Sequence, residues 1–190
     1  STDAITVTVN DADAAALTAA NLSTLGGKTS GTVTVTNAVA ITGDHDQLTA
    51  ALVTAGTKVV VSDATVTISD ADTTAITAAE LSAIGGATTG TVTVTNAVAI
   101  TGTAAEVTAA LVTAGTLVVV SDAAVTITGN PTITELNAIA AKTTGVVTAT
   151  LAADSLSNLG SLTTESTDAI TVTVNDADAA ALTAANLSTL

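Results

Sequence analysis

Pairs of aspartates separated by one residue recur along this chain, and carboxylates in such pairs are candidate ligands for a metal ion. Hard cations such as Ca²⁺ take about six to eight oxygen ligands, and neighbouring chain segments can supply them together. The spacing therefore makes Ca²⁺ the candidate cofactor. The residues that would bind it are Asp11, Asp13, Asp44, Asp46, Asp70, Asp72, Asp176 and Asp178.

These aspartates also have a structural interpretation, which the sequence favours over metal binding. Each pair precedes an Ala-rich segment, and an Asp before a helix accepts hydrogen bonds from its first N–H groups and interacts favourably with the helix dipole. Another segment carries Thr103 there, with Glu106 three residues later, which is the spacing of a capping box. Because Thr and Asp alternate at this position, helix capping is the preferred role and Ca²⁺ binding the alternative.

The other reactive side chains do not form a catalytic set. His45 is the only histidine, the chain has no cysteine, and the residue equivalent to His45 one repeat later is Ala104. A serine or threonine nucleophile needs an oriented base, which one isolated histidine does not supply. Gly26-Gly27 and Gly85-Gly86 do not belong to a phosphate-binding loop. We therefore expect no enzyme, no catalytic or cofactor-binding residue, and an exposed turn position for His45.

The elements that position these residues repeat at several lengths. Residues 166–190 are identical to residues 1–25, so the sequence starts again at Ser166. Within that unit, Thr32–Thr57 and Thr91–Thr116 differ at only five of 26 positions, at an offset of 59. The unit therefore contains three modules, of which the last has 165 − 59 − 59 = 47 residues. We expect one 165-residue unit, 1–165, followed by the start of the next copy in a longer tandem array.

Each module divides into two similar halves. Alternation as in Thr32–Thr36 predicts a strand, a polar corner follows, and Val39–Ile41 predicts a second strand. Leu48, Ala51 and Leu52 then recur with helical spacing. Such a unit buries its apolar side chains only when it is stacked on others. The predicted fold is a repeat solenoid, either a β-solenoid or an α/β solenoid, with parallel sheets and strand-corner-strand-helix rungs of about 30 residues.

One half-module is shorter than the others. Val146–Gly160 lacks roughly ten residues relative to Thr32–Gly56. We expect this half to lose its second strand or to shorten its helix, and to interrupt the regular stack. The whole of residues 1–190 is still expected to form a single continuous solenoid.

Composition excludes several classes of partner. Seventeen acidic residues face three lysines and no arginine, which gives a net charge of −14, and aromatic residues are absent. Binding to nucleic acid requires cations or stacking rings, so nucleic acid is not an expected partner. No run of about 18 apolar residues is present, so we expect no membrane insertion.

Alternation directs Val33, Val35, Val66 and Ile68 inward and leaves rows of threonine outward. Such rows resemble the arrays of ice-binding proteins, but threonine is also the best polar strand former, so ice binding is the least favoured function. The small side chains also make a smooth face for lateral packing, and open strands are templates for a further rung. The outward threonines are Thr32, Thr34, Thr36, Thr65, Thr67, Thr91, Thr93, Thr95, Thr126 and Thr128.

Two motifs resemble a known group of proteins. They are I-T-G-T-A-A-E at Ile100–Glu106 and L-S-T-L-G-G-K-T-S-G at Leu22–Gly31. Together they resemble the Thr/Ala-rich tandem-repeat tracts of giant secreted bacterial proteins, notably cyanobacterial hemolysin-type (RTX-like) surface proteins. The resemblance covers nearly the whole chain. It implies an extracellular, acidic protein with a structural or adhesive role and supplies no catalytic residue.

The sequence thus predicts a structural repeat segment of an extracellular bacterial fibre, sheath or surface layer, located outside the cell or at its surface. The expected partner is the protein itself, with copies joined end to end and laterally. The alternative is a Ca²⁺-stabilised stalk of a surface adhesin, and an ice-binding protein is the third candidate.

Overall fold

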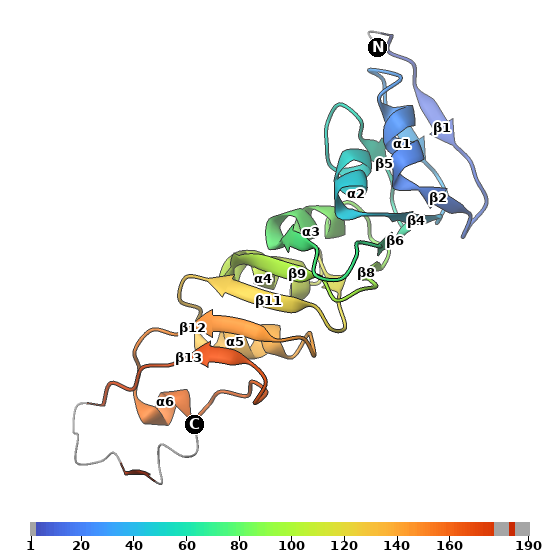
Figure 1. Cartoon of the computed structure of the whole chain (residues 1–190). Coiled ribbons are helices and arrows are strands. Elements are labelled where there is room, and N and C mark those ends of the chain that lie inside the picture. Colours follow the sequence, from blue (N-terminus) through green and yellow to red (C-terminus); the bar gives the residue numbers. More distant parts are fainter. Residues whose placement is uncertain (1–2, 177–182, 185–190) are drawn as a thin grey trace.

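The computed structural model describes residues 3–176 and 183–184, which form an elongated α/β fold (Figure 1). Within these residues, every strand is parallel to its neighbours, and the strands belong to three sheets of three, five and five strands. Six helices lie beside the described strands. Segments follow one another from one end of the molecule to the other, so contacts join neighbouring turns of the chain (Figure 1).

The strands are short, and their order in each sheet follows their order in the chain. The first sheet, β1-β3-β5, contains β1 Val7–Val9, β3 Val33–Val35 and β5 Val59–Val60. The second, β10-β8-β6-β4-β2, contains β2 Ala16–Thr18, β4 Ala40–Gly43, β6 Thr65–Ile68, β8 Val92–Val94 and β10 Val118–Val119. The third, β13-β12-β11-β9-β7, contains β7 Ala75–Thr77, β9 Ala99–Thr103, β11 Ala124–Thr128, β12 Val147–Thr150 and β13 Ala169–Thr171.

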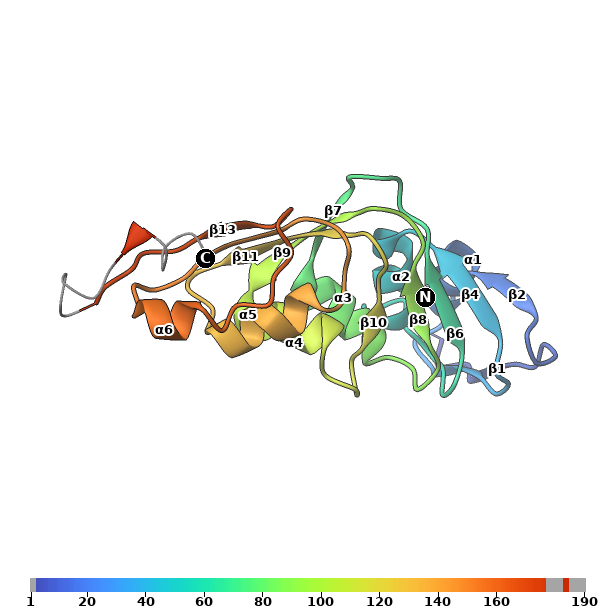
Figure 2. The same ribbon diagram turned by 90° about the horizontal axis from the view of Figure 1, so that it is seen from below.

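The helices begin at polar caps and bury one face against the strands. The buried residues of α2 are Leu48, Ala51 and Leu52, which confirms the face predicted from their spacing. In Figure 2, α4, α5 and α6 lie along one side of the third sheet. The six helices are α1 Ala19–Gly26, α2 His45–Leu52, α3 Ala78–Gly85, α4 Ala104–Leu111, α5 Ile133–Ala140 and α6 Leu156–Leu159.

The prediction of a repeat solenoid built from strand-corner-strand-helix rungs is wrong. The described strands divide among three separate parallel sheets, and none of these sheets runs along the whole chain. Paired residues are also closer in sequence than predicted, since Val7 lies opposite Val33 and Ala149 lies opposite Ile170. The fold is therefore an α/β arrangement of three parallel sheets with helices beside them.

The transition between sheets explains why the predicted regular stack does not form. The strands β5, β6 and β7 follow one another with no helix between them, and they belong to the first, second and third sheets respectively. As a result, β6 pairs with β4 on one side and with β8 on the other, although β4 and β8 occupy different places in their modules. The chain thus passes from the first sheet to the second before β6, and from the second sheet to the third after β6.

The shortened third module is confirmed in the structure. Between β12 and the helix that follows, no second strand like β9 is formed, and α6 has only four residues. The preceding helix, α5, likewise follows β11 directly, whereas α3 is preceded by both β6 and β7. The missing residues therefore remove corner strands and half of one helix, and the last described strands all stay in the third sheet.

The core is a thin layer of aliphatic side chains stacked between turns. Val33, Val35, Val66 and Ile68 are buried, as the alternation predicts. None of the ten threonines predicted to face outward is among the buried residues. A Cβ at Gly90 would overlap the carbonyl oxygen of Ala64, so glycine is needed where these two turns meet. Among the described residues, no helix is long and apolar enough to cross a membrane.

Candidate functional site

Asp70, in the corner that follows β6, contacts the first turn of α2. Its Oδ2 atom accepts a hydrogen bond of 2.8 Å from the His45 backbone N–H, and its Oδ1 atom lies 2.7 Å from His45 Nδ1. The Asp70 side chain is only 5% exposed. A buried carboxylate needs such partners, because an unpaired charge in this position is strongly destabilising. One side chain thus ties the beginning of α2 to the next turn of the chain.

His45 is not the exposed turn residue that the sequence suggested. Its side chain is 14% exposed and packs in the first turn of α2, with Nε2 3.7 Å from the exposed Asp46 carboxylate. Partial burial opposes protonation of the ring. The hydrogen bond to Asp70 and the charges of Asp70, Asp46 and Glu80 outweigh that effect, so the pKa of His45 lies above its ordinary value. The folded protein therefore binds the His45 proton more tightly than the unfolded chain does.

Asp70 and Asp72 also contact the turn that follows them. The Asp70 carbonyl oxygen accepts a hydrogen bond of 2.5 Å from Asn96 Nδ2, and Asp72 Oδ1 accepts one of 3.1 Å from the Ala97 N–H. The triplet Asp70–Asp72 thus contacts α2 of the preceding turn through Asp70 and the next polar corner through both aspartates.

The triplet Asp11–Asp13, which is equivalent to Asp70–Asp72, makes the same contacts with the turn that follows it. Asn37 Nδ2 donates a hydrogen bond to the Asp11 carbonyl oxygen, and the Ala38 N–H donates one of 3.2 Å to Asp13 Oδ1. Sequence reasoning missed this role. The recurrence of Asn37 and Asn96 at the same offset as the triplets was the only signal that pointed to it.

Helix capping is confirmed for Asp44 and wrong for the two triplets. The Asp44 side chain accepts a hydrogen bond from the Gln47 N–H at the beginning of α2. The N-caps of α1 and α3 are Thr18 and Thr77, which come several residues after the triplets. The intervening strands β2 and β7 separate each triplet from its helix, and the sequence pattern did not resolve these three-residue strands.

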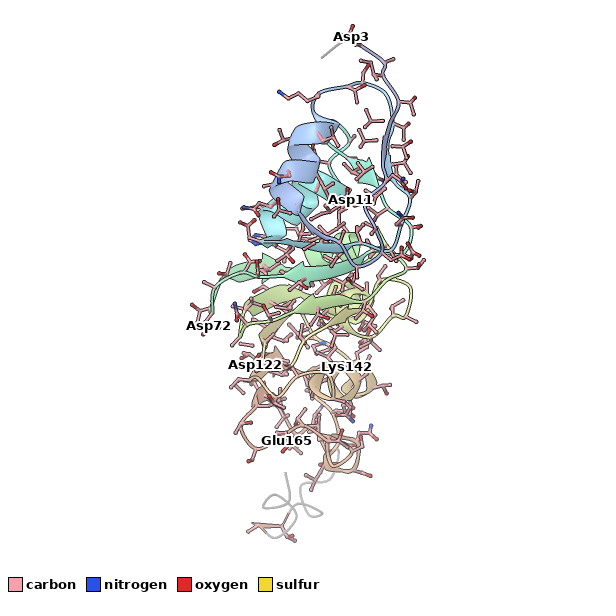
Figure 3. The ribbon with its side chains drawn as sticks, turned by 90° about the vertical axis from the view of Figure 1, so that its right-hand side faces the viewer. Asp3, Asp11, Asp72, Asp122, Lys142 and Glu165 are labelled. Atoms are coloured by element: carbon pink, nitrogen blue, oxygen red, sulfur yellow. The ribbon has the colours of Figure 1, made fainter. Side chains whose placement is uncertain are left out.

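Of the two remaining predicted ligands, Asp176 and Asp178, the structure describes only Asp176. Asp176 Oδ2 accepts a hydrogen bond of 3.1 Å from the Leu156 N–H, and Asp178 lies outside the described residues. Figure 3 shows the labelled acidic residues spread along the molecule, from Asp3 near one end to Glu165 near the other. In residues 3–176 and 183–184, no group of three or more His, Asp or Glu side chains is placed to hold a metal ion.

The capping box predicted at Thr103 and Glu106 is confirmed, and two more occur. In each box the threonine side chain accepts a hydrogen bond from the glutamate N–H, and the glutamate carboxylate accepts one from the threonine N–H. The hydrogen bonds from threonine lower the pKa of each glutamate below its ordinary value. The boxes are Thr77 with Glu80, Thr103 with Glu106 and Thr132 with Glu135.

A surface hollow of about 380 Å³ lies between the beginning of α5 and the turn around α6. Pro131, Leu151 and Asp154 contribute to its lining. The carboxylate of Asp154 accepts hydrogen bonds of 2.7 Å from the Ser155 N–H and 2.8 Å from Asn158 Nδ2. The lining contains no histidine, cysteine or lysine.

The outward face of the third sheet carries a column of threonines. Thr77, Thr101, Thr126 and Thr148 lie side by side on four neighbouring strands, and all four are exposed. Ala75, Ala99 and Ala124 form a second column beside them. Exposed apolar side chains occur on the other two sheets, at Val60 in β5 and Val119 in β10, both 43% exposed.

Comparison with known proteins identifies no relative of this chain. No family model, curated protein or solved structure matches the sequence or the fold. The resemblance to repeat tracts of secreted bacterial surface proteins therefore stays a prediction, and the function must be argued from the geometry.

Proposed function

We propose that this chain is a structural repeat segment that associates with copies of itself, as part of an extracellular bacterial fibre, sheath or surface layer. The observation that carries the proposal is the continuous column of exposed threonines across β7, β9, β11 and β12, with an alanine column beside it. Rows of small side chains on parallel strands form a flat face, and flat sheet faces can stack on one another.

The polar groups of the chain support a structural role. The carboxylates of Asp70, Asp72 and Asp13 accept hydrogen bonds from neighbouring turns, and those of Glu80, Glu106 and Glu135 cap helices. Nδ1 of His45, the only histidine, contacts Asp70 rather than a hydroxyl nucleophile. These groups hold successive turns together, and we therefore propose that the protein is not an enzyme.

Electron microscopy of the full chain over a range of concentrations tests this function. We expect filaments or sheets, and we expect Thr101→Lys and Thr126→Lys to reduce their number, because each places a charge in the exposed threonine column of the third sheet. Ala105→Lys adds the same charge at an exposed position of α4 and is the matched control. Isolated particles at every concentration would contradict the proposed function.

A further inference from the structure

We propose that the turn formed by β12 and α6 is a docking site for residues 3–11 of a second copy of this chain, so that copies join head to tail by exchanging this segment. The inference rests on the proposed structural function and specifies its partner and contact. Its basis is that residues 168–176, which have the same sequence as residues 3–11, already occupy this site within the chain.

Backbone contacts define the docking site. Parallel pairing places Thr148, Ala149 and Thr150 of β12 opposite Ala169, Ile170 and Thr171 of β13. Beyond the paired strands, the Leu151 N–H donates a hydrogen bond of 3.0 Å to the Thr171 carbonyl, and the Asp154 N–H donates one of 3.1 Å to the Thr173 carbonyl. In the opposite direction, the Asn175 N–H donates a hydrogen bond of 2.8 Å to the Asp154 carbonyl.

Two aspartates hold the ends of the docked segment in place through hydrogen bonds. The Asp168 carboxylate accepts hydrogen bonds of 2.8 Å from the Val147 N–H and 3.0 Å from the Glu165 N–H. The Asp176 carboxylate accepts one of 3.1 Å from the Leu156 N–H. Their equivalents in the first copy of the repeat are Asp3 and Asp11, so a second molecule carries the same fastening groups.

The two copies use opposite edges of the same segment. In the first copy, Val7 and Val9 bond the following turn: the Val7 N–H donates to the Thr32 carbonyl at 2.9 Å and the Thr36 N–H donates to the Val9 carbonyl at 3.3 Å. In the second copy, Thr171, Thr173 and Asn175 bond the preceding turn, and these correspond to positions 6, 8 and 10. Alternate residues of a parallel strand point their backbone groups to opposite sides.

Residues 3–11 can therefore bond a preceding turn without giving up their contacts with β3. Among the described strands, β1 is an edge strand of the first sheet and pairs only with β3. Ile5 is 58% exposed there, whereas its equivalent Ile170 packs against the core.

Residues 168–176 compete with the incoming segment. A segment tethered to its own docking site has a high effective concentration, so it closes the site in dilute solution. Exchange of an identical segment between two molecules replaces each hydrogen bond lost across the junction with the same hydrogen bond, which makes such exchange a low-cost route to oligomers. Weakening the second copy alone should therefore convert the closed chain into one that joins head to tail.

Substitutions placed in one copy at a time test the inference on the full chain. The opened variant carries Asp168→Ala and Ile170→Lys, which remove two hydrogen bonds and one core contact from the second copy. We expect it to form concentration-dependent dimers and longer chains in analytical ultracentrifugation, under dilute conditions in which the unsubstituted chain is monomeric. Adding Asp3→Ala and Ile5→Lys disables the incoming segment, and this combined variant is expected to be monomeric.

A labelled peptide with the sequence of residues 166–176 provides a second measurement. It is expected to bind the opened variant at least tenfold more tightly than the unsubstituted chain, and to break the oligomers in excess. A monomeric opened variant that does not bind the peptide would overturn the inference, as would oligomers of the combined variant. If the unsubstituted chain still forms filaments or sheets by electron microscopy, only this junction is wrong; if it forms none at any concentration, the proposed function itself is wrong.

Discussion

The corner after β6 and the corner after β11 occupy the same place in consecutive modules but are built differently. In the first, the Asp70–Asp72 triplet leads into β7, and Asp70 pairs with His45 of α2. In the second, Gly129 stands where Asp70 stands and Ala104 where His45 stands, and β11 runs directly to α5. The aspartate and its histidine partner in the preceding turn are thus both present at the first corner and both absent at the second.

This difference indicates that the aspartates of the triplets contact neighbouring turns rather than a local helix. The first corner leads from β6 in the second sheet to β7 in the third, whereas β11 already belongs to the third sheet and leads directly to α5. Only the first corner therefore positions an additional strand, and only there does an aspartate contact a histidine of the preceding turn. Where the corner strands are missing, the surface hollow beside Pro131 and Leu151 is found instead. The following experiments test whether the two corners differ in energy as they do in geometry.

The largest effect is expected for Asp70→Ala. The substitution removes the acceptor for the His45 N–H and for the His45 ring in a position that is 5% exposed. We expect the free energy of unfolding in urea to fall by about 2–3 kcal/mol, as for other hydrogen bonds to charged groups. Asp46→Ala, at a side chain that is 87% exposed, is the control and should change it little. Equal effects of the two substitutions would show that the contact between Asp70 and His45 does not stabilise the fold.

The backbone of the two corners should respond in opposite directions to glycine and alanine. Thr73 has a φ of 63°, in the left-handed region that disfavours β-branched residues, and Gly129 has a φ of 80°. We expect Thr73→Gly to raise the free energy of unfolding and Gly129→Ala to lower it, each by about 0.5–1 kcal/mol after the change in chain entropy is included. Thermal melting measures both, and shifts of the same sign would contradict the argument.

A smaller effect is expected from pH, at the first corner only. Because the folded-state pKa of His45 is raised, its contribution to stability is complete below the unfolded-state value of about 6.5 and is lost as the pH rises through the folded-state value. We therefore expect the unfolding midpoint to decrease as the pH rises above about 6.5.

The control for this prediction is His45→Ala, which reproduces the residue of the second corner. It should abolish the pH dependence in that range and leave the loss of stability in acid, where the capping glutamates with lowered pKa values become protonated. An unchanged slope in His45→Ala would assign the effect to another group.

The smallest effect is expected from Ca²⁺. Carboxylate oxygens of Asp13, Asp70 and Asp72 already accept hydrogen bonds from backbone N–H groups, and a Ca²⁺ site needs about six to eight oxygen ligands together. We expect millimolar Ca²⁺ to leave the melting temperature unchanged. A rise of several degrees that Asp72→Asn abolishes would instead support the predicted Ca²⁺ assignment at this corner.

Local features of the fold were predictable because they depend on near neighbours in the chain. The alternation at Thr32–Thr36 places Val33 and Val35 in the core, and the Thr103–Glu106 spacing forms a capping box. The missing residues in the third module predicted either a lost second strand or a shortened helix, and the structure shows both around α6. Each of these depends on side-chain direction or on hydrogen bonds within a few residues.

Contacts between turns were not predictable in the same way. His45, the partner of Asp70, lies in a different turn of the chain, and the residues around either position do not indicate the contact. The division into three sheets also escaped the sequence pattern, because a strand such as β6 shows the same alternation whichever strands lie beside it. The three-residue strands β2 and β7 were too short for alternation to reveal them.

By itself, the sequence determined which side chains face inward, where α2 and α4 begin, and which segments are equivalent. Only the tertiary structure decided which sheet each strand joins, which carboxylate each helix receives and which edge of a repeated segment is used. The physical reason is that side-chain direction follows from the local backbone period, whereas strand pairing depends on which turn is available as a neighbour. Residues 3–11 and 168–176 illustrate this: one sequence forms β1 beside the following turn and β13 beside the preceding one.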